Sequence, residues 1–321
     1  MSKLAELLAT HDYLIADGGM GTMLMAAGLE QGDPPEMWNV LHPNRIRTVH
    51  RGYIEAGSQI ILTNSFGGTS FRLKLHNLQD RVFELNKAAA ELARAEADAA
   101  ANPVVVGGSI GPTGEIMEPV GAMAYDDAVA AFADQAAGLA VGGVDVLWIE
   151  TMSDVNEVRA AVQGCREVIN LPIVATMTFD TNGRTMMGIT PVQAFTELSG
   201  MNLAALGGNC GNGPEEIEGV IQAMYATNQE YPFVAKSNAG IPEFVNGHLR
   251  YNGTPEVMAD YAVKVRNYGA RIIGACCGST PTHVAAMKAA LESTPIERQL
   301  VETAVAASAT RAPRRRSRRR G

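Results

Sequence analysis

The 321-residue sequence contains few cysteines, few aromatic residues and no long apolar run. Its four cysteines lack the regular spacing of a disulfide framework, which indicates a reducing compartment. No apolar stretch reaches the roughly 18–20 residues that a membrane-spanning helix needs. The N-terminal residues MSKLAELLATHDYLIADGG carry charges in their first turns and have no signal-peptide core. We therefore expect a cytoplasmic protein without a membrane segment.

Positive charge is concentrated in one short segment. Residues 310–321 (TRAPRRRSRRRG) contain seven arginines and no acidic residue, and removing these charges from the net charge of −8 leaves −15 on the other residues. So acidic a body argues against a nucleic-acid-binding fold. We expect the basic segment to be a solvated, disordered arm, because like charges repel and it has nothing to bury. A contact of this arm with RNA, an anionic surface or an acidic partner is the alternative.

Eight short apolar runs occur, mostly at the spacing of βα units, with Ala-, Glu- and Leu-rich helical patterns between them. The runs are continuous rather than alternating, as in strands that are buried on both faces. Eight such repeats in about 290 residues predict a (β/α)8 TIM barrel, with a doubly wound sheet as the alternative. The runs cover residues 13–19, 59–66, 103–111, 144–152, 172–180, 203–211, 232–240 and 271–279.

Polar or sulfur-containing side chains stand at the C-terminal end of nearly every run. A closed barrel gathers these ends around one mouth, whereas an open sheet scatters them, so the barrel is favoured. Two longer insertions, Met25–Arg45 and Ile110–Tyr125, are expected to lie over that mouth. We expect a barrel domain at residues 1–296, followed by a short helix-like extension and the Arg-rich tail at 297–321. The strand-end residues are Asp17, Thr63 to Ser65, Ser109, Glu150, Asp180, Cys210, Asn238 and Cys276.

Three cysteines have the same glycine-rich context at strand ends. Cys276 and Cys277 follow the eighth run in RIIGACCGST, and Cys210 follows the sixth in GGNCGNG. Neighbouring side chains of a regular strand point to opposite faces, so two adjacent sulfurs can meet one target only where the chain leaves strand geometry. Gly274 and Gly278 are expected to supply that freedom. Three thiolates and one open position are typical of a catalytic zinc site.

Other interpretations exist for the same cysteines. A strained vicinal disulfide is one, and small buried apolar thiols are another.

Sulfur ligands favour zinc over magnesium, calcium or manganese. Zinc on three thiolates is a poor Lewis acid for water, but it lowers the pKa of a bound substrate thiol from about 8.5 into the neutral range. The reaction that suits such a site is attack of a thiolate on a methyl group carried by nitrogen or sulfur. Cys165, in a helical pattern, is expected to be structural.

The chain also contains seven motifs in a fixed order between about Leu14 and about Leu291: DGGMGT, ILTNSFGG, GSIGPTG, IETM, GGNCG, NAGIPEF and IIGACCGS. With these motifs it resembles the zinc-dependent homocysteine S-methyltransferases. That family includes betaine–homocysteine methyltransferase, enzymes that use S-methylmethionine, and the homocysteine-binding part of cobalamin-dependent methionine synthase. The resemblance implies a Zn2+ cofactor on Cys210, Cys276 and Cys277, with homocysteine as the methyl acceptor and methionine as the product.

The resemblance further implies how homocysteine binds. Asp17 and Glu150 would hold its ammonium group, and Asn238 would orient groups beside the zinc. A helix cap is the alternative role for Asp17, and a turn is the alternative for Asn238. The groups that would receive the substrate carboxylate are the backbone amides of Gly18 and Gly19 with Thr63 or Ser65, where Thr63 could instead simply close its strand.

Betaine is the expected methyl donor, by overall resemblance. A quaternary ammonium group calls for an aromatic cage, and Trp38 in PPEMWN is the candidate for one wall, with ordinary loop packing as the alternative. Trp148, Phe66, Tyr125 and Phe244 are further candidates for the cage. Because PPEMWN and TNSFGG also resemble methionine synthase, S-methylmethionine, dimethylsulfoniopropionate and a methyl-corrinoid protein stay open as donors.

Two hypotheses from other classes compete with this interpretation. The first is a non-catalytic zinc- or thiol-binding protein that its basic tail tethers to RNA or to an acidic partner. The second is an aldolase-type barrel enzyme whose cysteines are structural. It requires a catalytic lysine, and Lys236 at the end of the seventh run is the candidate.

Overall fold

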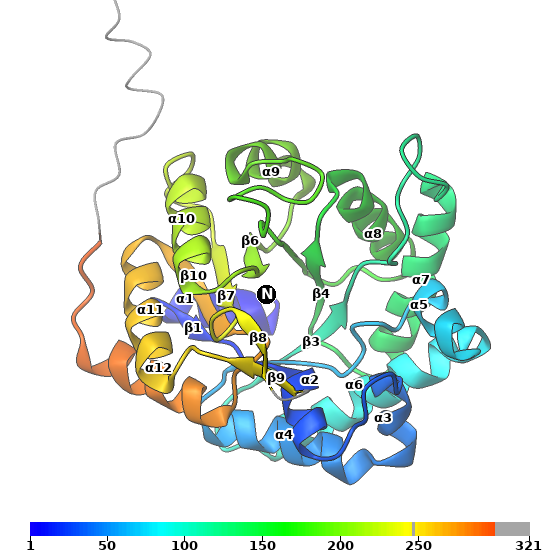
Figure 1. Cartoon of the computed structure of the whole chain (residues 1–321), viewed down its shortest axis with the longest axis horizontal. Coiled ribbons are helices and arrows are strands. Elements are labelled where there is room, and N and C mark those ends of the chain that lie inside the picture. The colour runs from blue at the N-terminus through cyan, green and yellow to red at the C-terminus, as the bar shows by residue number, and fades with distance from the viewer. Residues whose placement is uncertain (246–247, 299–321) are drawn as a thin grey trace, which may run out of the picture.

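The structure is a computed structural model that describes residues 1–245 and 248–298. Eight parallel strands surround a central axis and helices form the outer ring, which confirms the predicted (β/α)8 barrel (Figure 1). The first and last strands of the hydrogen-bonded order are joined by a single parallel bridge between Ala16 and Ile60, so the barrel is nearly closed. In sheet order the strands are β1 (Leu14–Ile15), β10 (Ala270–Ala275), β7 (Phe233–Ser237), β6 (Ala205–Cys210), β5 (Ile173–Met177), β4 (Val146–Met152), β3 (Val105–Ile110) and β2 (Ile60–Leu62).

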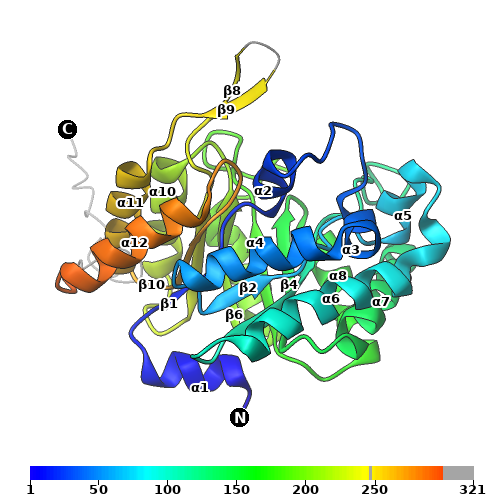
Figure 2. The same cartoon turned by 90° about the horizontal axis from the view of Figure 1, so that it is seen from below.

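Each barrel strand lies in one of the eight apolar runs, apart from β10, which begins one residue before its run, at Ala270. The reason is burial on both faces, since one face packs against the helices and the other fills the barrel interior. Trp148 is fully buried in this interior, and Leu4 of the N-terminal helix α1 (Lys3–Thr10) joins the same cluster. Figure 2 shows α1 at the opposite end of the barrel from α2 (Met20–Ala26), so the two ends of the barrel differ in what covers them.

The outer helices begin at recognisable sequence signals. Thr190 caps α9 (Pro191–Leu198) in a capping box with Gln193, as the TP dipeptide predicts. Thr254 caps α11 (Pro255–Asn267) by accepting a hydrogen bond from the Val257 amide. The remaining helices are α3 (Trp38–Leu41), α4 (Pro43–Glu55), α5 (Ser70–Leu73), α6 (Val82–Ala99), α7 (Tyr125–Val141), α8 (Val155–Val168), α10 (Pro214–Tyr225) and α12 (Pro281–Ser293).

One element at the mouth was not predicted. The segment after β7 forms an antiparallel hairpin of β8 (Pro242–Val245) and β9 (His248–Tyr251). Figure 2 shows this hairpin on the same side of the barrel as α2. The predicted boundary at residue 296 stays a prediction, and the Arg-rich tail lies outside the described residues. No helix in the described parts of the chain is long and apolar enough to cross a membrane.

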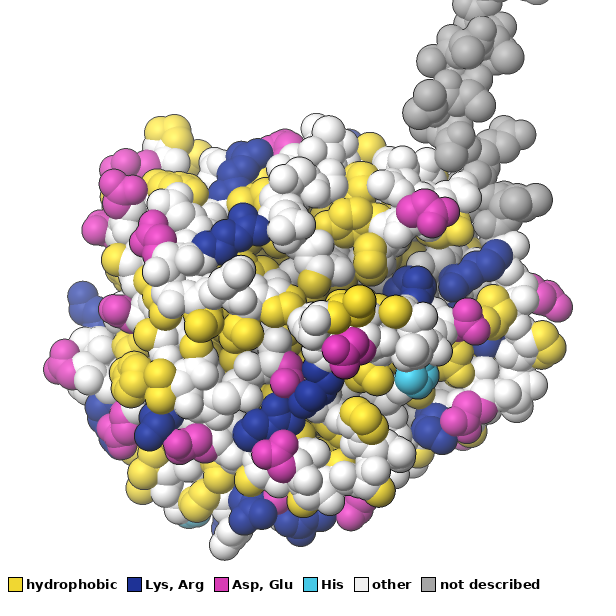
Figure 3. Space-filling view, turned by 180° about the vertical axis from the view of Figure 1, so that it is seen from behind, with side chains coloured by type: hydrophobic (Ala, Val, Ile, Leu, Met, Phe, Trp, Pro, Cys, Tyr) yellow, Lys and Arg dark blue, Asp and Glu magenta, His cyan; other side chains and the backbone are white. Residues whose placement is uncertain are grey.

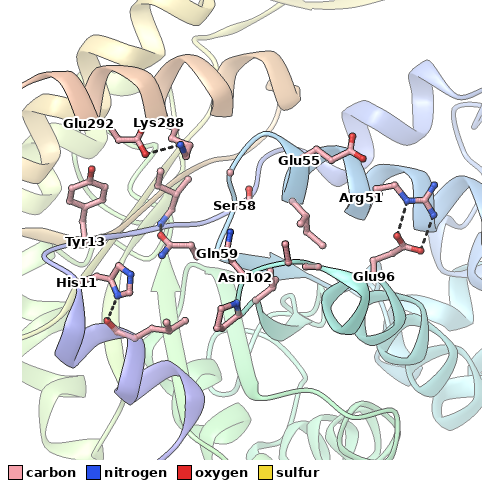
Figure 4. Close-up of a pocket in the computed structure, with 18 of the residues that line it drawn as sticks. His11, Tyr13, Arg51, Glu55, Ser58, Gln59, Glu96, Asn102, Lys288 and Glu292 are labelled. Carbon is pink, nitrogen blue, oxygen red and sulfur yellow. Dashed lines mark hydrogen bonds and ion pairs between the residues drawn. The ribbon is translucent and has the colours of Figure 1, made fainter.

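A cavity of about 940 Å3 lies at the α1 end of the barrel (Figure 4). Ion pairs flank it, with Arg51 bonded to Glu96 and Lys288 bonded to Glu292. None of its described lining residues is a cysteine. On the corresponding face of the molecule, acidic and basic side chains are interspersed (Figure 3). The predicted cysteine site, at the C-terminal ends of the strands, lies at the opposite end of the barrel, where TIM-barrel enzymes carry their active sites.

Candidate metal centre and substrate pocket

The three cysteines that the sequence singled out lie together at the C-terminal ends of the strands. Cys210 is the last residue of β6, whereas Cys276 and Cys277 follow β10, and only β7 separates the two strands in the sheet. The Sγ atoms of Cys210 and Cys276 are 3.1 Å apart, and all three Sγ atoms lie within 4.8 Å of one another. Cysteines that are distant in the sequence thus form one cluster.

Backbone geometry brings the adjacent sulfurs to one side. Cys210 has a left-handed φ of 60°, and Gly278 has a φ of 81°, so the chain turns sharply at both sites. The Asn238 side chain joins the two turns, because it accepts a hydrogen bond from the Cys277 amide at 3.0 Å and donates one to the Gly211 carbonyl at 2.7 Å. Asn238 therefore fixes the relative position of the two cysteine-bearing segments.

Gly274 has a different role from the one expected. It has no left-handed φ, and the strand runs on past it to Ala275. A Cβ atom at this position would lie 2.9 Å from Ala16 Cβ and 3.1 Å from Lys236 Cγ. Gly274 therefore provides space inside the barrel, and only Gly278 supplies the turn.

The donor set fits a thiophilic dication. Four-coordinate zinc with Zn–S bonds of about 2.3 Å requires sulfur–sulfur separations of about 3.8 Å. The three Sγ atoms lie within 4.8 Å of one another, so small side-chain movements would bring them onto one such ion. Hydrogen bonds from the Cys210 and Cys276 thiols lower the pKa of Cys277 to about 3, and the same sharing raises the pKa of Cys210. Three thiols this close together cannot all ionise without a cation, so a metal ion would resolve this competition.

Asn209, the residue before Cys210, is a site residue that the sequence analysis missed. Its amide oxygen accepts hydrogen bonds from the Thr151 amide at 2.8 Å and from the Thr176 hydroxyl at 2.7 Å, and its nitrogen donates to the Thr151 hydroxyl at 2.7 Å. Asn209 Nδ2 also lies 4.0 Å from Cys276 Sγ. Its position inside the GGNCG motif was the available signal.

A cavity of about 290 Å3 opens beside the sulfurs. Its walls come from the ends of β1, β2, β3, β4, β6, β7 and β10, so the strand ends do converge as the barrel hypothesis requires. Most of the predicted site residues line this cavity, namely Asp17, Gly18, Gly19, Thr63, Ser65, Glu150, Cys210, Cys276 and Cys277.

Glu150 has one oxygen in this cavity that lacks a hydrogen-bond partner within the described residues. Its Oε1 accepts a hydrogen bond of 2.5 Å from the Ser109 hydroxyl. Burial raises the pKa of Glu150 to about 7, against the opposing effect of Lys236. Because Oε2 makes no hydrogen bond within the described residues, it is available to a ligand that donates one.

Asp17 is arranged differently. Its Oδ1 is 2.6 Å from the ammonium group of Lys236, and its Oδ2 accepts a 2.7 Å hydrogen bond from the Leu62 amide. Helix α2 begins after Gly19 without any side-chain cap, so Asp17 is not a helix cap. Lys236 is 2% exposed and was considered from the sequence only as an aldolase lysine. Here it is an ion-pair partner.

The groups expected to bind a carboxylate are largely engaged with one another. The Thr63 and Ser65 hydroxyls are 2.6 Å apart, and the Ser109 amide donates to Thr63 Oγ1 at 2.9 Å. The Gly19 amide donates to Ser279 Oγ at 3.0 Å. The Gly18 amide makes no hydrogen bond within the described residues and remains open to a ligand.

Of the cage candidates whose side chains the structure describes, Phe66 lines the cavity and Trp38, Tyr125 and Trp148 do not. The side chain of Phe244, the remaining candidate, lies outside the described part of the chain. Trp38 is 6% exposed and packs against His42, while the Arg45 guanidinium lies 4.9 Å from its ring centroid. At the outer end of the cavity, Glu36 is buried and accepts a 2.7 Å hydrogen bond from the Gly67 amide. Arg72 and His76 line the same end.

These features define a class of protein: a TIM-barrel enzyme with a cluster of three thiols suited to a metal ion at its mouth. The chain belongs to the homocysteine S-methyltransferase family, whose model matches residues 14–291. The predicted family and the S-methyltransferase class are thereby confirmed, and the aldolase-type and non-catalytic hypotheses lose their support.

Individual relatives agree with this assignment. The chain is 30% identical over 305 residues to methionine synthase of Mycobacterium tuberculosis, and 29% identical to that of Mycobacterium leprae. It spans about a quarter of the length of these curated relatives, since the match covers 25% of each and 90% of this chain. The solved structure of the homocysteine methyltransferase MmuM from Escherichia coli in its metallated form is 26% identical, with a TM-score of 0.77 over 89% of this chain and 99% of that one. Its oxidized form gives 27% identity and the same TM-score.

Proposed function

We propose that this chain is a zinc-dependent homocysteine S-methyltransferase that forms methionine, with betaine as its leading methyl donor. The observation that carries the proposal is the convergence of three thiols beside a polar cavity at the barrel mouth. Cys210, Cys276 and Cys277 would hold the ion. Bound zinc would lower the pKa of the homocysteine thiol and keep its sulfur nucleophilic. A cytoplasmic location is part of the proposal, supported by four free cysteines.

The cavity floor suits the amino-acid part of homocysteine. Asp17, Glu150 and Lys236 together carry one negative charge in excess when both carboxylates are ionised, which matches a single ammonium group. The open Gly18 amide is the group to which we assign the substrate carboxylate. With both ends of the amino acid fixed, its thiol would lie toward the cysteines.

A betaine donor is supported by the family resemblance and by the outer end of the cavity. Phe66 offers an aromatic ring and Glu36 a buried carboxylate toward a quaternary ammonium group. Arg72 offers positive charge, and His76 a ring nitrogen for a hydrogen bond, to the carboxylate that betaine also carries. S-methylmethionine and dimethylsulfoniopropionate share this combination of an onium centre and a carboxylate, so they are the matched competitors.

The test is an assay of methionine formation from homocysteine on reduced, zinc-loaded protein with each of the three small donors in turn. We expect turnover with betaine and less with the two sulfonium compounds. Turnover with a sulfonium donor and none with betaine would correct the donor and keep the acceptor. No methionine with any donor, small or protein-bound, would refute the proposed function.

A second candidate is a methyl-corrinoid protein as the donor, and the rim of the mouth favours it. The segments that follow five of the barrel strands carry exposed large apolar side chains, which would suit contact with a protein partner. The methionine synthase relatives are also about four times as long as the matched region. Methionine formed with a methylcobalamin-loaded corrinoid protein, and not with small donors, would select this candidate. The apolar residues are Met25, Phe66, Leu75, Ile116, Val120, Met186, Met187 and Ile241.

A further inference from the structure

Lys236 is a buried cation that the proposed reaction does not use. It lies on β7, is 2% exposed, and its Nζ is 2.6 Å from Asp17 Oδ1 and 3.3 Å from the Asp17 carbonyl oxygen. The same Nζ is 6.0 Å from the ring centroid of Trp148. Since Leu62 occupies the second oxygen of Asp17, the Asp17 carboxylate already has two strong partners.

The barrel is built to hold this lysine. In the sheet register Lys236 stands between Asn209 of β6 and Gly274 of β10. A side chain at Gly274 would clash with the stem of Lys236 and with the Asp17 carbonyl, at 3.1 and 3.0 Å from a Cβ atom. The ion pair is therefore a fixed part of the floor.

Glu150 offers the contrast. It lines the same cavity, yet only one of its oxygens is hydrogen-bonded, to Ser109. A substrate ammonium group that approaches the floor meets one carboxylate whose charge is neutralised by Lys236 and one that is free. Because buried charges require pairing, the ammonium group is directed to the free carboxylate.

We propose that Lys236 is a substrate-positioning residue that occupies Asp17 and thereby directs the amino group of the acceptor to Glu150 alone. The inference rests on the proposed function for the identity of the acceptor as an amino acid with a thiol. It departs from the expectation that Asp17 and Glu150 share the ammonium group.

The experiment is a double-mutant cycle read by calorimetric binding to zinc-loaded protein. The two ligands are homocysteine and 4-mercaptobutanoate, which lacks the amino group. The dissociation constant of 4-mercaptobutanoate divided by that of homocysteine measures recognition of the ammonium group. In the wild-type background Glu150→Gln should lower this ratio by about 10- to 100-fold, the range for a charge-assisted hydrogen bond. In a Lys236→Met background the same change should cost less than about 5-fold, because Asp17 is then free to accept the ammonium group.

A second variant covers the case in which Lys236→Met alone prevents folding because it leaves the buried Asp17 carboxylate unpaired. Asp17→Asn combined with Lys236→Met removes both charges at once, and this variant should keep the wild-type ratio, because Glu150 is untouched. Lys288→Met on the outer helix α12 is the matched control for loss of one lysine charge. Thermal melting establishes that each variant is folded.

Two results would overturn the inference: Glu150→Gln costing the same in both backgrounds, or the Asp17→Asn/Lys236→Met variant losing the preference for homocysteine. A wild-type protein that binds neither thiol would instead refute the proposed function, so the two failures are distinguishable.

Discussion

His50 should make the stability of the barrel depend on pH. It lies on α4, is fully buried, and neither ring nitrogen has a hydrogen-bond partner within the described residues. Burial lowers the pKa of His50 from 6.5 to about 4, against a smaller opposing effect of Glu96. The folded protein therefore holds His50 neutral at pH values where the unfolded chain already binds a proton.

The sign and size of the effect follow from proton linkage. The stabilisation is fully present above pH 6.5 and is lost as the pH falls toward 4, because the unfolded state takes up the extra proton. At pH 5 the loss amounts to about 2 kcal/mol, and at pH 7 it is close to zero. The whole shift, if the pH reached 4 or below, would correspond to about 3 kcal/mol.

The assay is urea unfolding at pH 7 and pH 5 for the wild type and for His50→Leu, which cannot titrate. The leucine variant should lose about 2 kcal/mol less between the two pH values than the wild type. Packing differences caused by leucine act equally at both pH values and cancel in this comparison. Equal losses in the two proteins would refute the reasoning.

Two further predictions concern the site. Asn209→Ala should weaken zinc binding by about 10- to 100-fold, because Asn209 hydrogen-bonds Thr151 and lies beside the sulfurs. Competition with a chromophoric chelator measures the affinity, and an unchanged value would remove Asn209 from the site. Phe66→Leu should raise the KM for betaine severalfold in steady-state assays, whereas Trp38→Leu should leave this KM nearly unchanged. The reason is that Phe66 lines the cavity and Trp38 does not. A larger effect of Trp38→Leu than of Phe66→Leu would restore Trp38 to the donor site.

The fold could be predicted because a parallel barrel leaves a strong trace in the sequence. Strands buried on both faces appear as continuous apolar runs, and the spacing of the runs matches one helix per strand. The sulfur cluster was also predictable, since the ends of all barrel strands meet at one mouth. Cys210 and the Cys276–Cys277 pair needed no knowledge of distances beyond that topology.

Other parts of the site depend on packing that sequence patterns do not specify. Nothing in VAKSNAG indicates that Lys236 reaches across β10 to Asp17, because the choice of partner depends on barrel register and on the space at Gly274. Trp38 is apolar enough for a cage and equally suited to burial, and its place against His42 and Arg45 is decided by the conformation of a long loop.

The central claim is that three sulfurs from distant parts of the chain hold one catalytic zinc ion, and metal analysis of purified, reduced protein tests it most directly. We predict one zinc ion per chain in the wild type and in the Cys165→Ser variant. The Cys165 thiol of the wild type is buried in α8 and does not belong to the cluster. Cys276→Ser should lose both the metal and methionine formation. Full zinc content and full turnover in that variant, or a metal-free wild type with full activity, would contradict the account.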